Sequence, residues 1–409
     1  MYIQKLSLMT IVFGGLFFSA ISYYLPIFSN PSWPFFIITY LSAIFLFFAK
    51  IKSKIAFVDI SFLLLISYIF LSFLFFGQSD PTRFYYYLIL FILLPYISGK
   101  TFGIYINNKD LNIILSIGLI SLFIISTELV TNPSLLTNDR LILFTSDDYD
   151  GTGGSSIAIN MNIVFGASAI ILFYRSFFSK KYKSIVNGVL CLIFLAYITL
   201  FASRSGIVSI FVTFLLMYFL KNKPSPKSIL QMFIFFLIAM MIFGFLIFNS
   251  SDDRLNFILD IPLAIQSAST IFGCNLTIDG SIISRIIMWS EAINLFLDNI
   301  IFGVGSSNYG YSYCGQPEDL ASPHMYILHI ASELGVIGVI FYILFLFFIF
   351  KISTKNDLHL KSDTNFIFLS IWIYLILISQ LNGNYFYDLH IFFISGLLAS
   401  MSKSNPEIR

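Results

Sequence analysis

Residues 322–350 read SPHMYILHIASELGVIGVIFYILFLFFIF, and this stretch decides the class of fold. Its second half is an apolar run that, at about 20 residues, crosses a hydrocarbon core of ~30 Å as a helix. Its first half carries His324, His329 and Glu333, although the whole chain has only four histidines. Polar groups at the mouth of a membrane helix either cap and pack it or carry out chemistry at the membrane surface.

The rest of the chain has the composition of a membrane protein. Of its 409 residues, 58% are hydrophobic and 11% are charged, whereas about 25% are charged in soluble proteins. The first apolar run is too long for a signal peptide, so we expect it to remain as a helix. The sequence predicts an all-α polytopic membrane protein with twelve spans, at 6–28, 32–49, 55–76, 84–98, 110–130, 157–175, 184–201, 205–220, 228–248, 325–350, 365–381 and 387–402.

The predicted spans divide the chain into three parts. Residues 1–248 hold the first nine helices, 249–324 form one large loop, and 325–409 hold the last three helices. Within the loop, residues 281–299 show helical periodicity with a narrow polar stripe. A helix of this kind is expected to lie on the membrane or on the bundle. The stripe consists of Ser281, Ser284, Arg285, Glu291 and Asp298.

Basic residues predict the orientation. With a cytoplasmic N-terminus, the cytoplasmic segments hold all 16 lysines together with Arg175 and Arg409, as the positive-inside rule requires. Both termini are then cytoplasmic and the large loop lies outside. The outer face has no lysine, yet it keeps five arginines, the residues suited to bidentate binding of phosphate. These are Arg83, Arg140, Arg204, Arg254 and Arg285.

Three of these arginines are candidates for binding an anionic substrate. Arg140 precedes an acidic, glycine-rich loop, Arg204 lies in a short turn between two spans, and Arg285 lies on the polar stripe. A structural role remains open for each of them, because arginines also cap helices, pair with nearby carboxylates and extend along the membrane interface.

The histidines have different predicted roles. His324 stands at the entrance of its helix beside Pro323, where it can take a proton near neutral pH, unless it only caps the helix. We expect His324 to act as a general base. His329 and Glu333 share a helix face, and we expect them to pair as a support because a lone buried carboxylate is costly.

The three cysteines have separate predicted environments. Cys191 lies inside a span and is expected to fill space. Cys274 and Cys314 lie in the outer loop, where an oxidising compartment allows a disulfide between them. Metal binding is the alternative, but no suitable cluster of ligands accompanies them. We therefore expect no metal.

Four stretches in order resemble the bacterial O-antigen ligase and polymerase superfamily. They are NDR (138–140) with its glycine-rich sequel, ASRSG (202–206), SRIIMWSEA (284–292) followed by FGVGSSNYG (302–310), and HMYILHIASELGVIG (324–338). The last is the most specific, with ten residues between its histidine and a Gly-x-x-Gly. One departure is Met325, where the family often has asparagine or serine.

The resemblance implies a GT-C-like, metal-independent glycosyltransferase in a Gram-negative inner membrane, with its active site facing the periplasm. The implied donor is an undecaprenyl-pyrophosphate-linked oligosaccharide, and a chain-length regulator is a candidate protein partner. Inner-membrane lipid surrounds the protein, and no cofactor and no nucleic acid are expected. The sequence favours an O-antigen polymerase over a ligase that acts on lipid A core. A lipid-linked oligosaccharide flippase is the alternative of another class, although it would place charges at mid-membrane depth.

Overall fold

The fold is given by a computed structural model of the 409-residue chain. Arg140, Cys274 and Cys314 lie outside the residues that it describes, as do the first two predicted spans. The described residues are 56–77, 81–103, 106, 108–131, 153–178, 183–200, 204–221, 230, 232–241, 281–309, 322–354, 362–382 and 388–401.

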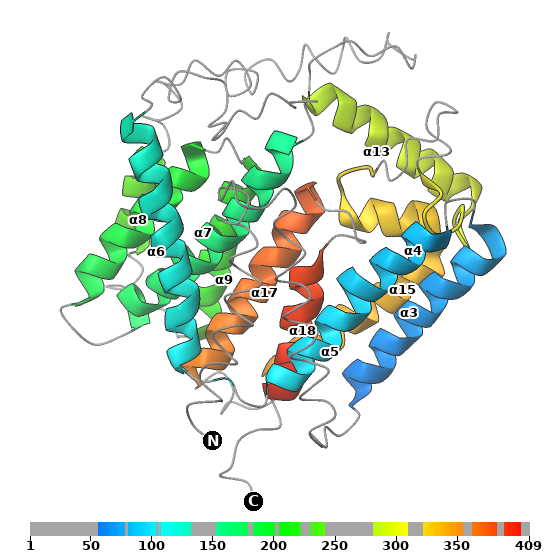
Figure 1. Ribbon diagram of the computed structural model, residues 1–409, viewed down its shortest axis with the longest axis horizontal. Helices are drawn as coiled ribbons and strands as arrows, with labels where there is room; N and C mark the ends of the chain where they lie inside the picture. The colour runs from blue at the N-terminus through cyan, green and yellow to red at the C-terminus, as the bar shows by residue number, and fades with distance from the viewer. Residues whose placement is uncertain are drawn as a thin grey trace, which may run out of the picture. The chain divides into compact units, whose positions relative to one another are not determined.

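The described residues form helices and connecting turns, and no strand occurs among them (Figure 1). The helices are α3 (Phe57–Phe76), α4 (Pro81–Tyr87), the π-helix η1 (Leu88–Leu93), α5 (Leu94–Phe102), α6 (Asn108–Thr131), α7 (Gly153–Phe178), α8 (Lys183–Leu200), α9 (Arg204–Lys221), α13 (Ser281–Asp298), α15 (Tyr326–Thr354), α17 (Asp363–Asn382) and α18 (Leu389–Met401). A further short helix covers Met232–Met241.

Each predicted span that falls on described residues coincides with a helix. Six helical segments among them are long and apolar enough to cross a membrane, and four others are apolar but shorter. The chain is therefore an all-α, multi-pass membrane protein, while the total of twelve spans stays a prediction. The predicted amphipathic helix of the large loop is present as α13. The three-part division of the chain also stays a prediction.

The chain forms two compact units. The first contains α6 to α9 and the beginning of α17, as far as Tyr374. Its centre is α7, whose residues 161–174 are all buried. The Phe173 ring stacks on Phe214 of α9 at 4.0 Å, and the Tyr374 hydroxyl donates to the Asn162 carbonyl at 2.9 Å. Cys191 is buried, as expected of a space-filling residue, and its thiol donates to the Ala169 carbonyl.

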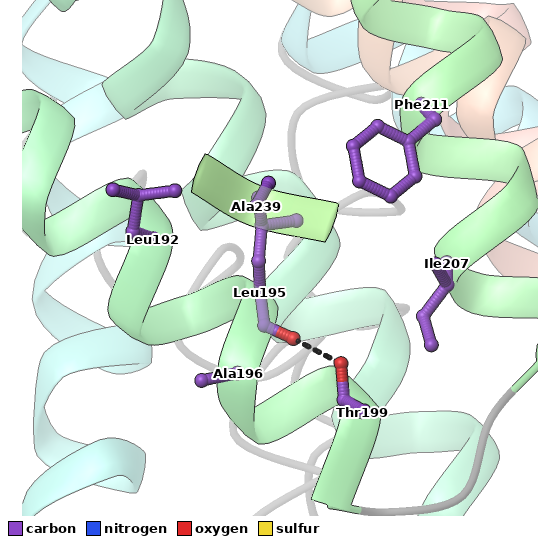
Figure 2. Close-up of a pocket in the computed structure, with 7 residues that line it drawn as sticks. All are labelled: Leu192, Leu195, Ala196, Thr199, Ile207, Phe211 and Ala239. Carbon is purple, nitrogen blue, oxygen red and sulfur yellow. Dashed lines mark hydrogen bonds between the residues drawn. The ribbon is translucent and has the colours of Figure 1, made fainter. Parts of the chain in front are cut away.

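A small apolar gap lies between α8, α9 and the helix Met232–Met241 of this unit. Figure 2 shows Thr199 at its edge, with a hydroxyl that donates to the Leu195 carbonyl at 2.9 Å. The gap has a volume of about 10 Å³, which is roughly the space that one water molecule needs. It is a packing defect and cannot admit a sugar or a lipid chain.

The second unit contains α3 to α5, α13, α15, α18 and the remainder of α17. Here α5 packs closely on α18, because glycines remove the side chains that would separate the two backbones. A Cβ atom added at Gly99 would overlap the Phe393 carbonyl, and one added at Gly396 would overlap the Tyr96 carbonyl. Small residues at such crossings bring membrane helices together.

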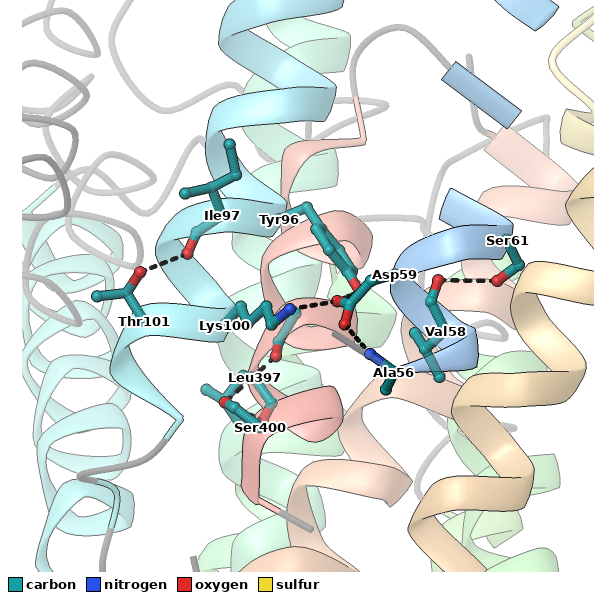
Figure 3. A network of polar contacts seen from close by, with 11 residues as sticks. Ala56, Val58, Asp59, Ser61, Tyr96, Ile97, Lys100, Thr101, Leu397 and Ser400 are labelled. Atoms are coloured by element: carbon teal, nitrogen blue, oxygen red, sulfur yellow. Dashed lines mark hydrogen bonds and ion pairs between the residues drawn. The ribbon is translucent and has the colours of Figure 1, made fainter. Parts of the chain in front are cut away.

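A polar network fixes one end of this unit, as Figure 3 shows. The Asp59 carboxylate accepts the Tyr96 hydroxyl at 2.9 Å and lies 2.6 Å from Lys100 Nζ. It also accepts the Ala56 N–H at 2.6 Å, which satisfies a free donor at the start of α3. The network therefore ties α3 to α5 through a shielded ion pair.

The predicted span at 84–98 is divided into α4, η1 and α5. Pro95 explains the division, because it has no N–H to donate to the preceding turn. The π-helix η1 (Leu88–Leu93) widens the turn that leads to this proline, and the Leu94 N–H donates to the Ile89 carbonyl. The segment Phe84–Phe102 nevertheless remains long enough to span a membrane.

Candidate functional site

Helix α15 is broken at Gly335, whereas the sequence predicts one continuous helix over 325–350. Gly335 has φ 62° and ψ −165°, a conformation that L-residues with a side chain rarely adopt. Figure 1 shows the helix in two segments that run in different directions. A Cβ atom added at Gly335 would also overlap the Ile301 carbonyl. The break thus requires glycine for two independent reasons.

The turn after α13 occupies this break. The Val336 N–H donates to the Ile300 carbonyl at 2.8 Å, and the Val304 N–H donates to the Ser332 carbonyl at 2.9 Å. The Tyr68 hydroxyl of α3 donates to the Leu334 carbonyl at 3.0 Å. Backbone groups that the broken helix leaves without helical partners are therefore satisfied by neighbouring segments, as buried polar groups require.

Glu333 is the centre of the arrangement. Its carboxylate is buried, with 1% exposure, and it accepts the N–H of Ser307 at 2.8 Å and the N–H of Tyr309 at 3.0 Å. Nε2 of His329 lies 3.3 Å from Oε1 of the same carboxylate. His329 and Glu333 thus lie within pairing distance of each other. Two further donors, which the sequence analysis did not foresee, offset the cost of burying the carboxylate.

The glycine-rich turn is shaped to hold this carboxylate. Gly303, Gly305 and Ser307 have φ values of 71°, 102° and 67°. A turn in which every second residue has a positive φ can direct several backbone N–H groups toward one side, where they bind an anion. In this turn the anion is the protein's own Glu333. The N–H groups of Ser307 and Tyr309 are therefore engaged internally and do not form a cradle for a substrate phosphate.

Helix α13 connects to the same centre through two hydrogen bonds. The Trp289 indole Nε1–H donates to the Pro323 carbonyl at 2.8 Å. The Tyr309 hydroxyl donates to the Met288 carbonyl at 2.8 Å, and the Tyr309 ring meets His329 edge-on at 5.8 Å. These hydrogen bonds therefore join three separate segments into one cluster, which consists of α13, the glycine-rich turn and the start of α15.

His324 lies at the edge of the cluster formed by α13, the glycine-rich turn and the start of α15. Its side chain is exposed and its backbone is left-handed, with φ 52°. Its N–H approaches the Ser322 hydroxyl at 3.4 Å. Because α15 begins at Tyr326, His324 precedes the helix. The separation between His324 and Glu333 therefore does not follow from the rise of a single helix.

A glutamine serves as a cap for α15. Gln380 of α17 accepts the Ile327 N–H through Oε1 at 3.2 Å. This contact satisfies a donor in the first turn of the helix, which weakens the view that His324 is only a cap. Gln380 was missed from the sequence, because no local pattern indicates that α17 meets the start of α15.

A second group of polar side chains lies beside the start of α15. The rings of Tyr326 and Tyr342 stack with centroids 5.1 Å apart, and both hydroxyls lie within electrostatic range of Asp388. Asp388 immediately precedes α18. The sequence offers only a weak signal for this group, a carboxylate at the edge of an apolar run.

The structure places the backbones of two predicted arginines. Arg204 is the first residue of α9, and Arg285 lies in the first turns of α13. Their side chains, like all of Arg140, lie outside the described part of the chain. The predicted cavity shared by Arg204, Arg285 and His324 stays a prediction, as does the disulfide between the outer-loop cysteines.

Residues 188–343 match the family described as O-antigen ligase. The matched region runs from α8 into α15, and it includes Trp289, the glycine-rich turn, His324 and Glu333. It supports membership of the O-antigen ligase/polymerase superfamily. The match also supports, in general terms, a glycosyl-transferring function of the O-antigen polymerase or ligase type. A search of curated proteins gives no match.

Proposed function

We propose that this protein is an O-antigen polymerase. It joins undecaprenyl-pyrophosphate-linked oligosaccharide repeat units at the periplasmic face of a bacterial inner membrane. The observation that carries the proposal is the position of His324, which is exposed and lies immediately before α15. Its neighbour Pro323 is held by Trp289. A proton acceptor at a membrane edge can meet both a lipid-linked donor and a hydroxyl from the aqueous side.

The proposed reaction is a single glycosyl transfer. The His324 imidazole accepts the proton of an acceptor hydroxyl, and the oxygen then bonds to the anomeric carbon of the donor sugar. The bond between that carbon and the pyrophosphate oxygen breaks, so undecaprenyl pyrophosphate leaves with both electrons. Arg140, Arg204 and Arg285 are proposed to neutralise its charge, because guanidinium groups bind phosphate oxygens in pairs. This scheme uses no metal and no cofactor.

The remaining architecture is part of the same proposal. It comprises a GT-C-like bundle of about twelve helices, as hydropathy predicts, with both termini in the cytoplasm. The predicted large loop, 249–324, covers the site, and a chain-length regulator is a proposed partner. Basic charge concentrated on the predicted cytoplasmic side supports this orientation.

A ligase is the second candidate. It would use the same donor, but its acceptor would be lipid A core instead of a second repeat unit. The match to the family described as O-antigen ligase supports both activities in general and does not separate them. The RSG, MWSEA and FGVGSSNYG stretches favour the polymerase. A flippase is less well supported, because His324 and the outer arginines are predicted to lie at one face.

Lipopolysaccharide from a strain without this gene separates the three activities. Core capped with a single repeat unit would indicate the polymerase. Bare core with lipid-linked polymer retained would indicate the ligase, and repeat units held on the cytoplasmic side would indicate the flippase. Complementation with the wild type, His324→Ala and His359→Ala tests the site. The control residue His359 lies in a predicted cytoplasmic segment, and only His324→Ala is expected to fail at equal expression.

A further inference from the structure

Helix α13 has an exposed face on which apolar and polar residues form separate stripes. Ala292, on its other side, is completely buried in the second compact unit. Ile293 and Leu297 are 44% and 57% exposed, and Asn294 and Asp298 are exposed as well. Consecutive helical residues differ by about 100° of rotation. The apolar pair and the polar pair therefore point in different directions.

The apolar stripe continues into the turn that follows the helix. Ile300, Ile301 and Phe302 each expose about half of their surface, at 50%, 56% and 51%. We call Ile293, Leu297 and these three residues the apolar lip. An open hollow of about 930 Å³ lies beside the lip. In water, such a cluster of large apolar side chains would be unfavourable.

The lip is continuous with surface that faces lipid. Phe76, the last residue of α3, lies against Phe302, with ring centroids 6.4 Å apart. The Asn308 amide donates to the Phe76 carbonyl at 2.5 Å, so the turn is fixed to this end of α3. The spanning helix α3 exposes apolar residues along its length, and Phe75 at the same end is 76% exposed. The lip therefore extends the exposed apolar surface of this candidate membrane-spanning helix.

From this continuity we infer that the apolar lip is an interfacial membrane anchor, whose side chains contact the acyl chains of the leaflet in which α3 ends. Asn294 and Asp298 then face the headgroups and water, as in helices that lie in the plane of a membrane surface. The inference rests on α3 being a spanning helix and does not depend on the proposed activity. It accounts for five exposed large apolar residues that no described segment covers.

The anchor also has a consequence for the candidate site. The Trp289 indole N–H of α13 donates a hydrogen bond to the Pro323 carbonyl, and the Tyr309 hydroxyl donates one to the Met288 carbonyl. Immersion of the lip therefore holds the segment that carries His324 near the level of the headgroups. A lipid-linked substrate presents its head group at this level.

Fluorescence quenching tests the anchor in the full-length protein. Single cysteines at positions 293, 297, 294 and 298 are labelled with an environment-sensitive fluorophore in phosphatidylethanolamine/phosphatidylglycerol vesicles. Cys274 and Cys314 are replaced by serine, and Cys191 is fully buried. We expect labels at 293 and 297 to be quenched by doxyl-labelled lipid and protected from iodide. The matched labels at 294 and 298 should be quenched by iodide and not by doxyl-labelled lipid.

Two results would overturn the inference. Quenching by iodide at all four positions would place the whole face in water. Protection of 293 and 297 from both quenchers would show that protein covers the lip, either another segment or a second copy. If the protein with serine at positions 274 and 314 does not fold, a tryptophan is introduced at position 294 or 297 of the wild-type protein. Its fluorescence is then measured in vesicles of brominated lipid. Only the tryptophan at 297 should be quenched beyond the quenching seen for the native tryptophans.

Discussion

The Glu333 carboxylate and the Ser307 N–H form a hydrogen bond of 2.8 Å that joins the broken helix α15 to the glycine-rich turn. Tyr309 adds a second N–H to the same carboxylate at 3.0 Å, and Nε2 of His329 lies 3.3 Å from it. A negatively charged side chain thus organises the turn from within. The stability of this region should depend on the charge of Glu333 more than on its size.

We expect Glu333→Gln to destabilise the protein by about 1–3 kcal/mol, because one amide NH₂ group must then face a backbone donor. Thermal unfolding in detergent measures the loss. Glu291→Gln on α13 is the matched control, and it should change little. A wild-type melting temperature for Glu333→Gln would show that the turn does not depend on the carboxylate.

His329→Ala should cost less stability than Glu333→Gln, since the Ser307 and Tyr309 N–H groups still satisfy the carboxylate. Loss of His329 therefore does not leave Glu333 without partners. Unfolding of both single variants and the double variant gives the coupling between the two residues. Additive losses would contradict a direct interaction between them.

His324→Asn should abolish polymer formation while it preserves the fold. Asparagine tolerates the left-handed backbone of this position, φ 52°, better than alanine does, but it cannot act as a general base. Loss of a general base typically lowers the rate by ~10²–10⁴-fold. Initial rates of chain extension with purified lipid-linked donor measure the effect. Near-normal polymer lengths at equal expression would make His324 a structural residue.

Arg204→Lys and Arg285→Lys should each remain well below wild-type activity, although both keep the positive charge. Lysine lacks the planar fork that binds two phosphate oxygens at once. Arg254→Lys, on the same predicted face, is the control and should be active. Full activity in the two lysine variants would reduce the role of these arginines to a simple positive charge.

Gly335→Ala should impair folding or insertion of the second compact unit. The added methyl group meets the Ile301 carbonyl, and the backbone has φ 62°. This combination of φ and ψ is essentially restricted to glycine, and it costs a residue with a side chain on the order of 1–3 kcal/mol. Size-exclusion chromatography in detergent measures the yield of folded protein. Gly188→Ala in α8 is the matched control. Its added methyl group would meet a side-chain atom, the Ser176 hydroxyl at 3.1 Å, so the yield of folded protein should change little.

Cys274 and Cys314 should form a disulfide in protein isolated from an oxidising compartment. The bond requires Cα atoms about 4.4–6.8 Å apart. Alkylation without reduction, followed by mass spectrometry of the peptides, detects the linked pair. Free thiols at both positions under these conditions would exclude the bond.

The sequence by itself determined the class of this protein. Apolar runs of membrane length predict helices wherever they occur, because each helix satisfies its own backbone and needs no distant partner. The amphipathic pattern of 281–299 predicted α13, and the four-residue spacing of His329 and Glu333 predicted their pairing for the same local reason.

Only the tertiary structure decided how the candidate site is assembled. The break at Gly335, the two backbone donors to Glu333 and the cap by Gln380 all join residues far apart in the chain. A pattern in one segment cannot indicate which other segment will satisfy its backbone. The sequence could therefore single out His324, but the surroundings that hold it arise from packing between α13, α15 and α17.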